Sequence, residues 1–166
     1  MTRHERDRDE SGRPRNERPR DALGRPLPPG SQGIPRIPDD LDLSPSETLA
    51  LARDLLDRGL AFNAHEVLEA AWKNGPEAER TLWQSLAQLA VGITHVQRGN
   101  RKGAVTVLER ASEGLALCGA APHDVDVAGL RDYAEGLIND LAGLTAITPE
   151  RLRPPLIVSR KGIPGT

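Results

Sequence analysis

His65, Glu69 and Trp72 are the residues whose types and spacing best suit a functional site. They stand in the stretch F-N-A-H-E-V-L-E-A-A-W-K at spacings of four and three. In a helix they therefore form one stripe beside the apolar face. Glu69 can share a hydrogen bond with the His65 imidazole, either fixing its tautomer or holding it protonated, and the indole can shield the pair from water. His65 and Glu69 are the candidate catalytic residues.

A second polar stripe follows on the next predicted helix, where Gln84, Gln88 and His95 recur at helical spacing. Because the two helices are adjacent in the chain, we expect their polar stripes to face each other. The sequence thus predicts a polar pocket between the second and third helices. Its lining residues would be His65, Glu69, Trp72, Gln84, Gln88 and His95.

Three interpretations of this pocket remain open. His65, Glu69 and His95 together form a ligand set that suits zinc, iron or manganese, and a water on such a metal could become a nucleophile near neutral pH. A metal-free site would use His65 as proton carrier and Glu69 as its orienting partner. The third interpretation is structural, a buried hydrogen-bonded network that determines which helices pair.

Helical periodicity runs through most of the chain. Ser44-Pro45-Ser46-Glu47 is typical of a helix start, with a capping hydroxyl, a proline in the first turn and a carboxylate at the third position. Apolar residues recur at helical spacing. The predicted helices span residues 44 to 58, 61 to 73, 77 to 98, 101 to 117 and 125 to 142. The fold class is therefore all-α, with about five helices.

An internal repeat links the first four helices. An offset of 40 residues aligns Gly59 with Gly99, Ala64 with Ala104, Leu68 with Leu108 and Ala71 with Ala111. We expect two pseudo-repeated antiparallel helical hairpins and a C-terminal helix. Gly92, His95, Gly99, Ala104, Leu108 and Ala111 also stand at spacings that resemble tetratricopeptide repeats. An irregular helical bundle is the alternative.

A longer sequence pattern points to a family. The signature H-x-x-x-E-x-x-W, followed by L-W-Q-S-L-A-Q-L-A-V-G-I-T-H-V-Q-R-G-N-R-K-G-A, resembles the bacterial and archaeal family catalogued as domain of unknown function 309. The resemblance covers about residues 45 to 117. It implies a small all-helical domain whose signature residues match His65, Glu69 and Trp72, and it implies no activity.

The ends of the chain differ in composition from the helical region at residues 44–144. Residues 1–43 form a mixed-charge extension rich in arginine and proline, which we expect to be either disordered or an ordered strap across the domain or a partner. Residues 145–166 contain four prolines and are predicted to be an irregular tail.

Composition limits the classes of function. The net charge of −2 provides no overall basic field, so no nucleic-acid partner is expected. Arg98, Arg101, Lys102 and Arg110 cluster around one predicted turn, which could hold an anion or be a solvated turn. The single Cys118 and the lack of a membrane-spanning apolar run predict a cytoplasmic protein that does not enter a membrane.

These features favour a small cytoplasmic binding or scaffold module with a polar pocket between the second and third helices. A peptide segment, including the chain's own N-terminal extension, could occupy that pocket, and the same face could form a homodimer. The alternative function is a small metal-dependent hydrolase that uses His65, Glu69 and His95.

Overall fold

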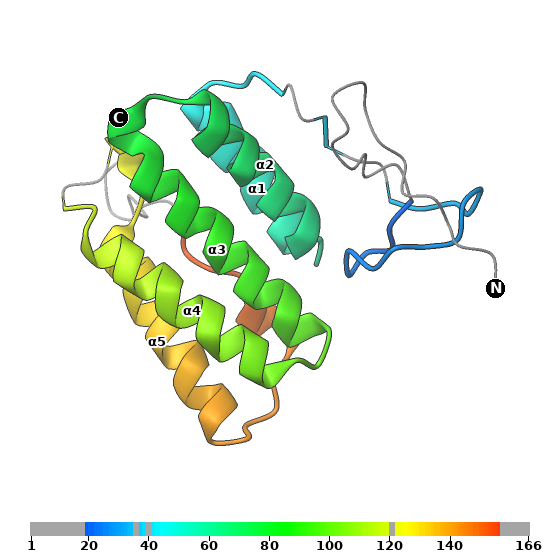
Figure 1. Cartoon of the computed structure of the whole chain (residues 1–166). Coiled ribbons are helices and arrows are strands. Elements are labelled where there is room, and N and C mark those ends of the chain that lie inside the picture. The colour runs from blue at the N-terminus through cyan, green and yellow to red at the C-terminus, as the bar shows by residue number, and fades with distance from the viewer. Residues whose placement is uncertain (1–18, 35–36, 39–40, 120–121, 157–166) are drawn as a thin grey trace, which may run out of the picture.

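The computed structural model describes residues 19–34, 37–38, 41–119 and 122–156. In these ranges the chain forms five α-helices and three short 3-10 helices, and it contains no β-strand (Figure 1). The α-helices are α1 Pro45–Asp57, α2 Ala61–Asn74, α3 Arg80–Gln97, α4 Arg101–Ala116 and α5 Val127–Ala142. The 3-10 helices are η1 Glu77–Glu79, η2 Pro122–Asp124 and η3 Pro149–Leu152. The all-α prediction is confirmed.

The start of α1 follows the local sequence. The Ser44 hydroxyl accepts a hydrogen bond from the Glu47 backbone N–H at 3.2 Å, and the Glu47 carboxylate accepts one from the Ser44 backbone N–H at 3.1 Å. This capping box satisfies two backbone donors that a helix start leaves without partners. Pro45, at the first helical position, has no N–H to satisfy.

Each α-helix packs against the next one in the chain, so α3 lies between α2 and α4. Figure 1 shows the chain reversing direction between α1 and α2, between α2 and α3, and between α3 and α4. The core is built mainly from leucine and alanine side chains contributed by all five helices. With only four aromatic side chains in the chain, close helix packing depends on small residues at the contacts.

The α1–α2 and α3–α4 turns have the same backbone structure. Gly59 and Gly99 both adopt the left-handed conformation, with φ of 76° and 75°. In the first turn the Leu60 N–H donates to the carbonyl of Leu55, and in the second the Asn100 N–H donates to that of His95, each at 2.8 Å. The matching structure of the two turns confirms the predicted pair of helical hairpins.

Two predicted helix starts were wrong by two or three residues. Residues 77–79 form η1 rather than the first turn of α3, because the Glu79 N–H bonds the Pro76 carbonyl in a tighter turn. Helix α5 begins at Val127 and not near residue 125. Its start is determined by Asp126, whose carboxylate accepts a hydrogen bond from the Gly129 N–H at 3.0 Å.

The segment that follows α5 packs against the helices. Leu152 and Leu156 are 8% and 2% exposed and belong to the hydrophobic core. The Tyr133 hydroxyl donates to the Arg151 carbonyl at 2.6 Å, and the Asp126 N–H donates to the Leu156 carbonyl at 3.1 Å. These contacts were not predicted from the sequence. Residues 157–166 lie outside the described residues.

Residues 19–34, hereafter the N-terminal loop, form a compact structure. The Asp21 carboxylate accepts hydrogen bonds from the N–H groups of Leu23 and Arg25, each at 2.9 Å, and the Ile34 N–H donates to the Arg20 carbonyl at 2.8 Å. The loop is attached to the helices at Leu23, whose carbonyl accepts a hydrogen bond from Arg98 at 2.8 Å. Residues 1–18 lie outside the described residues, so the prediction for that part of the extension stays a prediction.

None of the helices in the described ranges combines the length and the apolar character that a membrane-spanning helix needs.

Candidate functional site

The predicted stripe on α2 brings His65 and Glu69 together, and Lys73 joins them in a row of ionisable side chains. His65 Nε2 lies 3.1 Å from one Glu69 carboxylate oxygen, and the Lys73 ammonium lies 2.8 Å from the other. Exposure rises along the row, from 21% at His65 to 36% at Glu69 and 57% at Lys73. The sequence placed His65 and Glu69 correctly relative to each other, because an i, i+4 spacing brings side chains together in any α-helix.

Aromatic and cationic side chains surround this row. The Phe62 ring lies 5.6 Å from the His65 ring, tilted by 50°. The half-buried Trp72 ring carries the Arg80 guanidinium on its face at 4.8 Å. The described contact of Trp72 is thus a cation–π contact with the start of α3.

Burial lowers the pKa of His65 below its ordinary value. The charge of Glu69 and the Phe62 backbone carbonyl act in the opposite direction but do not overcome the loss of hydration. The folded protein therefore favours a neutral His65, which is the form that can accept a proton.

We expect His65→Gln to flatten the dependence of stability on pH. Because the folded pKa of His65 is lowered, its stabilising contribution is complete above the unfolded pKa of about 6.5 and is lost as the pH falls below that value. Thermal unfolding followed by circular dichroism between pH 8 and about pH 5 measures the effect. If the variant loses stability in parallel with the native chain, the interpretation is wrong.

The predicted lining residues on α3 lie in different surroundings. Gln84 is exposed, Gln88 is half-buried, and His95 Nδ1 lies 3.2 Å from the Asn100 amide in the α3–α4 turn. None of the six predicted lining residues lines either of the two pockets described below. In the described part of the chain, no three His, Cys, Asp or Glu side chains form a group that could hold a metal ion. His65, Glu69 and His95 are therefore not brought together as ligands.

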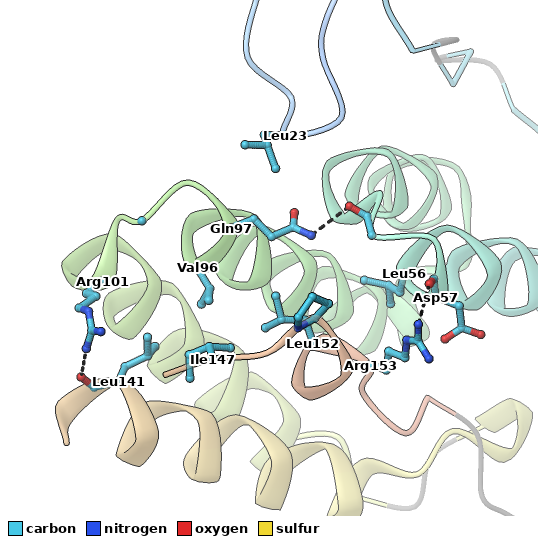
Figure 2. A pocket seen from close by; sticks show the side chains of 13 residues that line it. Leu23, Leu56, Asp57, Val96, Gln97, Arg101, Leu141, Ile147, Leu152 and Arg153 are labelled. Atoms are coloured by element: carbon cyan, nitrogen blue, oxygen red, sulfur yellow. Dashed lines mark hydrogen bonds between the residues drawn. The ribbon is translucent and has the colours of Figure 1, made fainter. Parts of the chain in front are cut away.

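The larger pocket lies where several helices end, and we call it the bundle-end pocket (Figure 2). Its volume is about 460 Å³. It is lined by Leu23, Leu56, Asp57, Gly59, Val96, Gln97, Gly99, Arg101, Leu141, Ile147, Pro149, Leu152 and Arg153. These residues come from the N-terminal loop, the ends of α1, α3 and α5, the start of α4 and the segment around η3.

The floor of the bundle-end pocket is apolar. Figure 2 shows Val96, Ile147 and Leu152 in its centre, with Arg101 at one end and Arg153 at the other. Both guanidinium groups donate to carbonyls at helix ends. Arg101 bonds the Leu141 carbonyl at 3.0 Å, and Arg153 bonds the Asp57 carbonyl at 3.4 Å. The arginines therefore offset the negative ends of α5 and α1, and the cavity between them has an apolar floor with polar groups at its margin.

Gln97 lies between this floor and the N-terminal loop. Its amide N–H donates to the Gly59 carbonyl at 2.9 Å, which ties the end of α3 to the α1–α2 turn. Its Oε1 atom is buried and has no hydrogen-bond partner among the described residues. Figure 2 shows Leu23 of the N-terminal loop above Gln97. The N-terminal loop thus lies over a buried acceptor that has no partner in the described part of the chain.

A smaller pocket of about 200 Å³ lies near the other ends of α1 and α2. Glu79 and Trp83 form one of its walls. Glu79 Oε1 lies 2.8 Å from His123 Nε2 and accepts a hydrogen bond from the Trp83 indole at 3.1 Å. The hydrogen bond from His123 is the main reason that the pKa of Glu79 falls below its ordinary value. These contacts join the α4–α5 connection to η1.

Most of the bundle-end pocket was not predicted from the sequence. Arg101 was predicted only as part of a cation cluster that could hold an anion or be a solvated turn. Leu56, Gln97 and Ile147 carry no spacing that relates them, because they meet only when the helices pack. A polar residue in the last turn of a helix, as Gln97 is in α3, was the one available signal.

Residues 49–107 match the family model described as Domain of unknown function (DUF309). The match runs from α1 into α4, includes the H-x-x-x-E-x-x-W signature, and confirms the predicted family resemblance. The pocket residues from α5, η3 and the N-terminal loop lie outside it. No protein with a curated description and no solved structure matches the chain.

Proposed function

We propose that this chain is a binding module whose ligand enters the bundle-end pocket. The observation that carries the proposal is a pocket of about 460 Å³ with an apolar floor and a few polar groups at its margin. Binding sites for small molecules and peptide side chains commonly have this size and composition. The pocket lies between helix ends, where the side chains of four helices meet.

The charges at the margin favour a ligand with a mainly apolar body. The guanidinium groups of Arg101 and Arg153 already donate to backbone carbonyls, and the Asp57 carboxylate opposes their positive charge. The available binding energy therefore comes mainly from burying apolar surface against Val96 and Ile147. Peptide side chains and small apolar molecules fit this description.

Filling the pocket is expected to weaken this binding. The fluorescent probe anilinonaphthalene sulfonate, which emits strongly in apolar surroundings, should bind the native chain with a stoichiometry of one. Ile147→Trp places a larger ring in the pocket and should weaken the probe's affinity about tenfold or more, equivalent to ~1.4 kcal/mol. Fluorescence titration measures both values.

Leu144→Trp is the matched control, because Leu144 is 73% exposed, lies three residues earlier and does not line the pocket. It should bind the probe as the native chain does. Far-ultraviolet circular dichroism establishes that both variants are folded. Equal probe affinities for a folded Ile147→Trp variant and the native chain would refute the proposed site.

A further inference from the structure

We infer that the N-terminal loop is an internal ligand of the bundle-end pocket, and that the external ligand is a peptide turn presenting a leucine-like side chain. The inference rests on the proposed function, because it names the occupant of the same pocket. It starts from the contacts of Leu23, the residue of the loop that lines the pocket.

Leu23 is held at the pocket by its backbone. The Asp21 carboxylate accepts a hydrogen bond from the Leu23 N–H and so shapes the turn, while the Leu23 carbonyl accepts one from Arg98 at 2.8 Å. These hydrogen bonds fix the backbone of a short turn, and the turn positions Leu23 at the pocket. Any peptide with an apolar side chain and a carbonyl in the same relation could make these contacts.

Gly24 supplies the second contact of the loop. It has a φ of 75° and is buried against Phe62, so closely that a Cβ atom at this position would overlap the Phe62 ring. The guanidinium groups of Arg20 and Arg98 lie 5.0 and 6.0 Å from the centre of that ring. The surface around Phe62 therefore requires a glycine directly after the apolar residue of the turn.

The closed position of the loop leaves one buried hydrogen-bond acceptor without a partner among the described residues. This acceptor is Gln97 Oε1, and a buried acceptor without a partner destabilises the closed arrangement. Opening the loop lets water or a ligand donor reach this atom. The loop is held by the Leu23–Arg98 hydrogen bond, the Gly24–Phe62 contact and the packing of Ala22 and Ile34 against the core, and it is opposed by one desolvated acceptor.

Gly24→Val tests the internal contact without changing any residue of the helices. The side chain would overlap Phe62 and must displace the loop. In the native chain the probe can bind only those molecules whose loop is open, so the apparent affinity for the probe is reduced in proportion to that fraction. The variant should therefore bind anilinonaphthalene sulfonate up to about tenfold more tightly than the native chain.

Gly30→Val is the matched control. Gly30 belongs to the same loop and has a similar φ of 85°, but a Cβ atom there would meet nothing within 4 Å. Both valines strain a left-handed backbone, and only the one at Gly24 reaches the helical surface. If the two variants bind the probe equally tightly, the internal-ligand inference is overturned, whereas failure of both the native chain and the Gly24→Val variant to bind the probe would overturn the proposed function.

The occupant is tested with a synthetic peptide of residues 19–34 added to the full-length Gly24→Val protein. The peptide should displace the probe, and a peptide with Leu23→Ala should do so at least about tenfold less well. The native chain, with its own loop in place, should bind the added peptide more weakly than the variant. Equal displacement by the two peptides, or none by either, would overturn the assignment of the ligand.

Discussion

Gly92→Val is expected to destabilise the domain by about 3 kcal/mol, the upper range for overpacking a core. Gly92 is buried in α3 where that helix crosses α4. A Cβ atom at this position would lie 2.6 Å from Cδ2 and 2.7 Å from Cγ of Leu108. Leu108 is itself fully buried, so neither its side chain nor the backbone of α4 can move aside without opening the core.

A double variant separates this clash from other effects of the valine. Leu108→Ala alone removes buried side-chain volume and should cost about 3 kcal/mol. In the combined Gly92→Val, Leu108→Ala variant the valine enters the space that the leucine vacates, so the double variant should be more stable than the sum of the two losses by at least about 1 kcal/mol. Urea unfolding measures all three free energies. Additive losses would show that Gly92 is not limited by Leu108.

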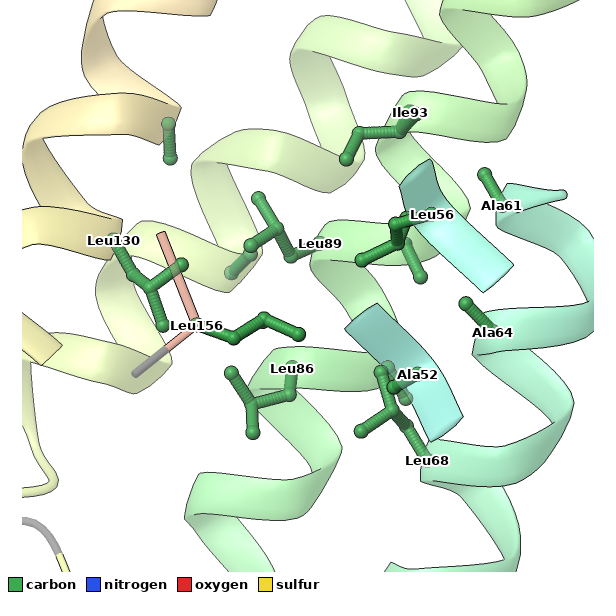
Figure 3. Packing of buried hydrophobic residues seen from close by; sticks show 14 of the residues in the cluster. Ala52, Leu56, Ala61, Ala64, Leu68, Leu86, Leu89, Ile93, Leu130 and Leu156 are labelled. Atoms are coloured by element: carbon green, nitrogen blue, oxygen red, sulfur yellow. The ribbon is translucent and has the colours of Figure 1, made fainter. Parts of the chain in front are cut away.

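Leu156→Ala is expected to cost about 3 kcal/mol, as large as a leucine deletion within a core helix. Leu156 lies outside every helix, yet it is 2% exposed. Figure 3 shows it among Leu86 and Leu89 of α3 and Leu130 of α5. Its carbonyl also accepts the Asp126 N–H at 3.1 Å, which holds the backbone at the start of α5.

Leu144→Ala provides the comparison for Leu156→Ala, because Leu144 precedes it by twelve residues and is 73% exposed. Surface substitutions of this kind usually change stability by less than about 0.5 kcal/mol. Chemical unfolding of both variants tests whether the segment after α5 is part of the cooperative core. A Leu156→Ala variant as stable as Leu144→Ala would contradict the packing in Figure 3.

The helices were predictable because their determinants lie within a few residues of each other. The capping box at Ser44 and Glu47 and the left-handed glycines at Gly59 and Gly99 all act over one turn of backbone. The same holds for the contact between His65 and Glu69, which depends only on helical spacing. The errors at η1 and α5 are also local, since a tighter 3-10 turn and a capping aspartate shift a start by two or three residues.

The predicted role of the α3 stripe illustrates where local reasoning ends. Gln84, Gln88 and His95 share a polar face of α3, but the rotation of that helix against α2 is determined by packing across the whole core. The structure leaves Gln84 exposed and pairs His95 with Asn100 in the following turn. A polar stripe on each of two adjacent helices therefore does not establish that the two meet.

By itself, the sequence determined the fold class, the paired hairpins, the family resemblance and the geometry of the α2 stripe. Only the tertiary structure decided which residues form a pocket. Leu23, Gln97 and Ile147 are far apart in the chain and meet because helix ends, the N-terminal loop and the segment after α5 converge. The physical reason is that helix formation depends on hydrogen bonds over four residues, whereas a pocket is the space that packing of distant segments leaves unfilled.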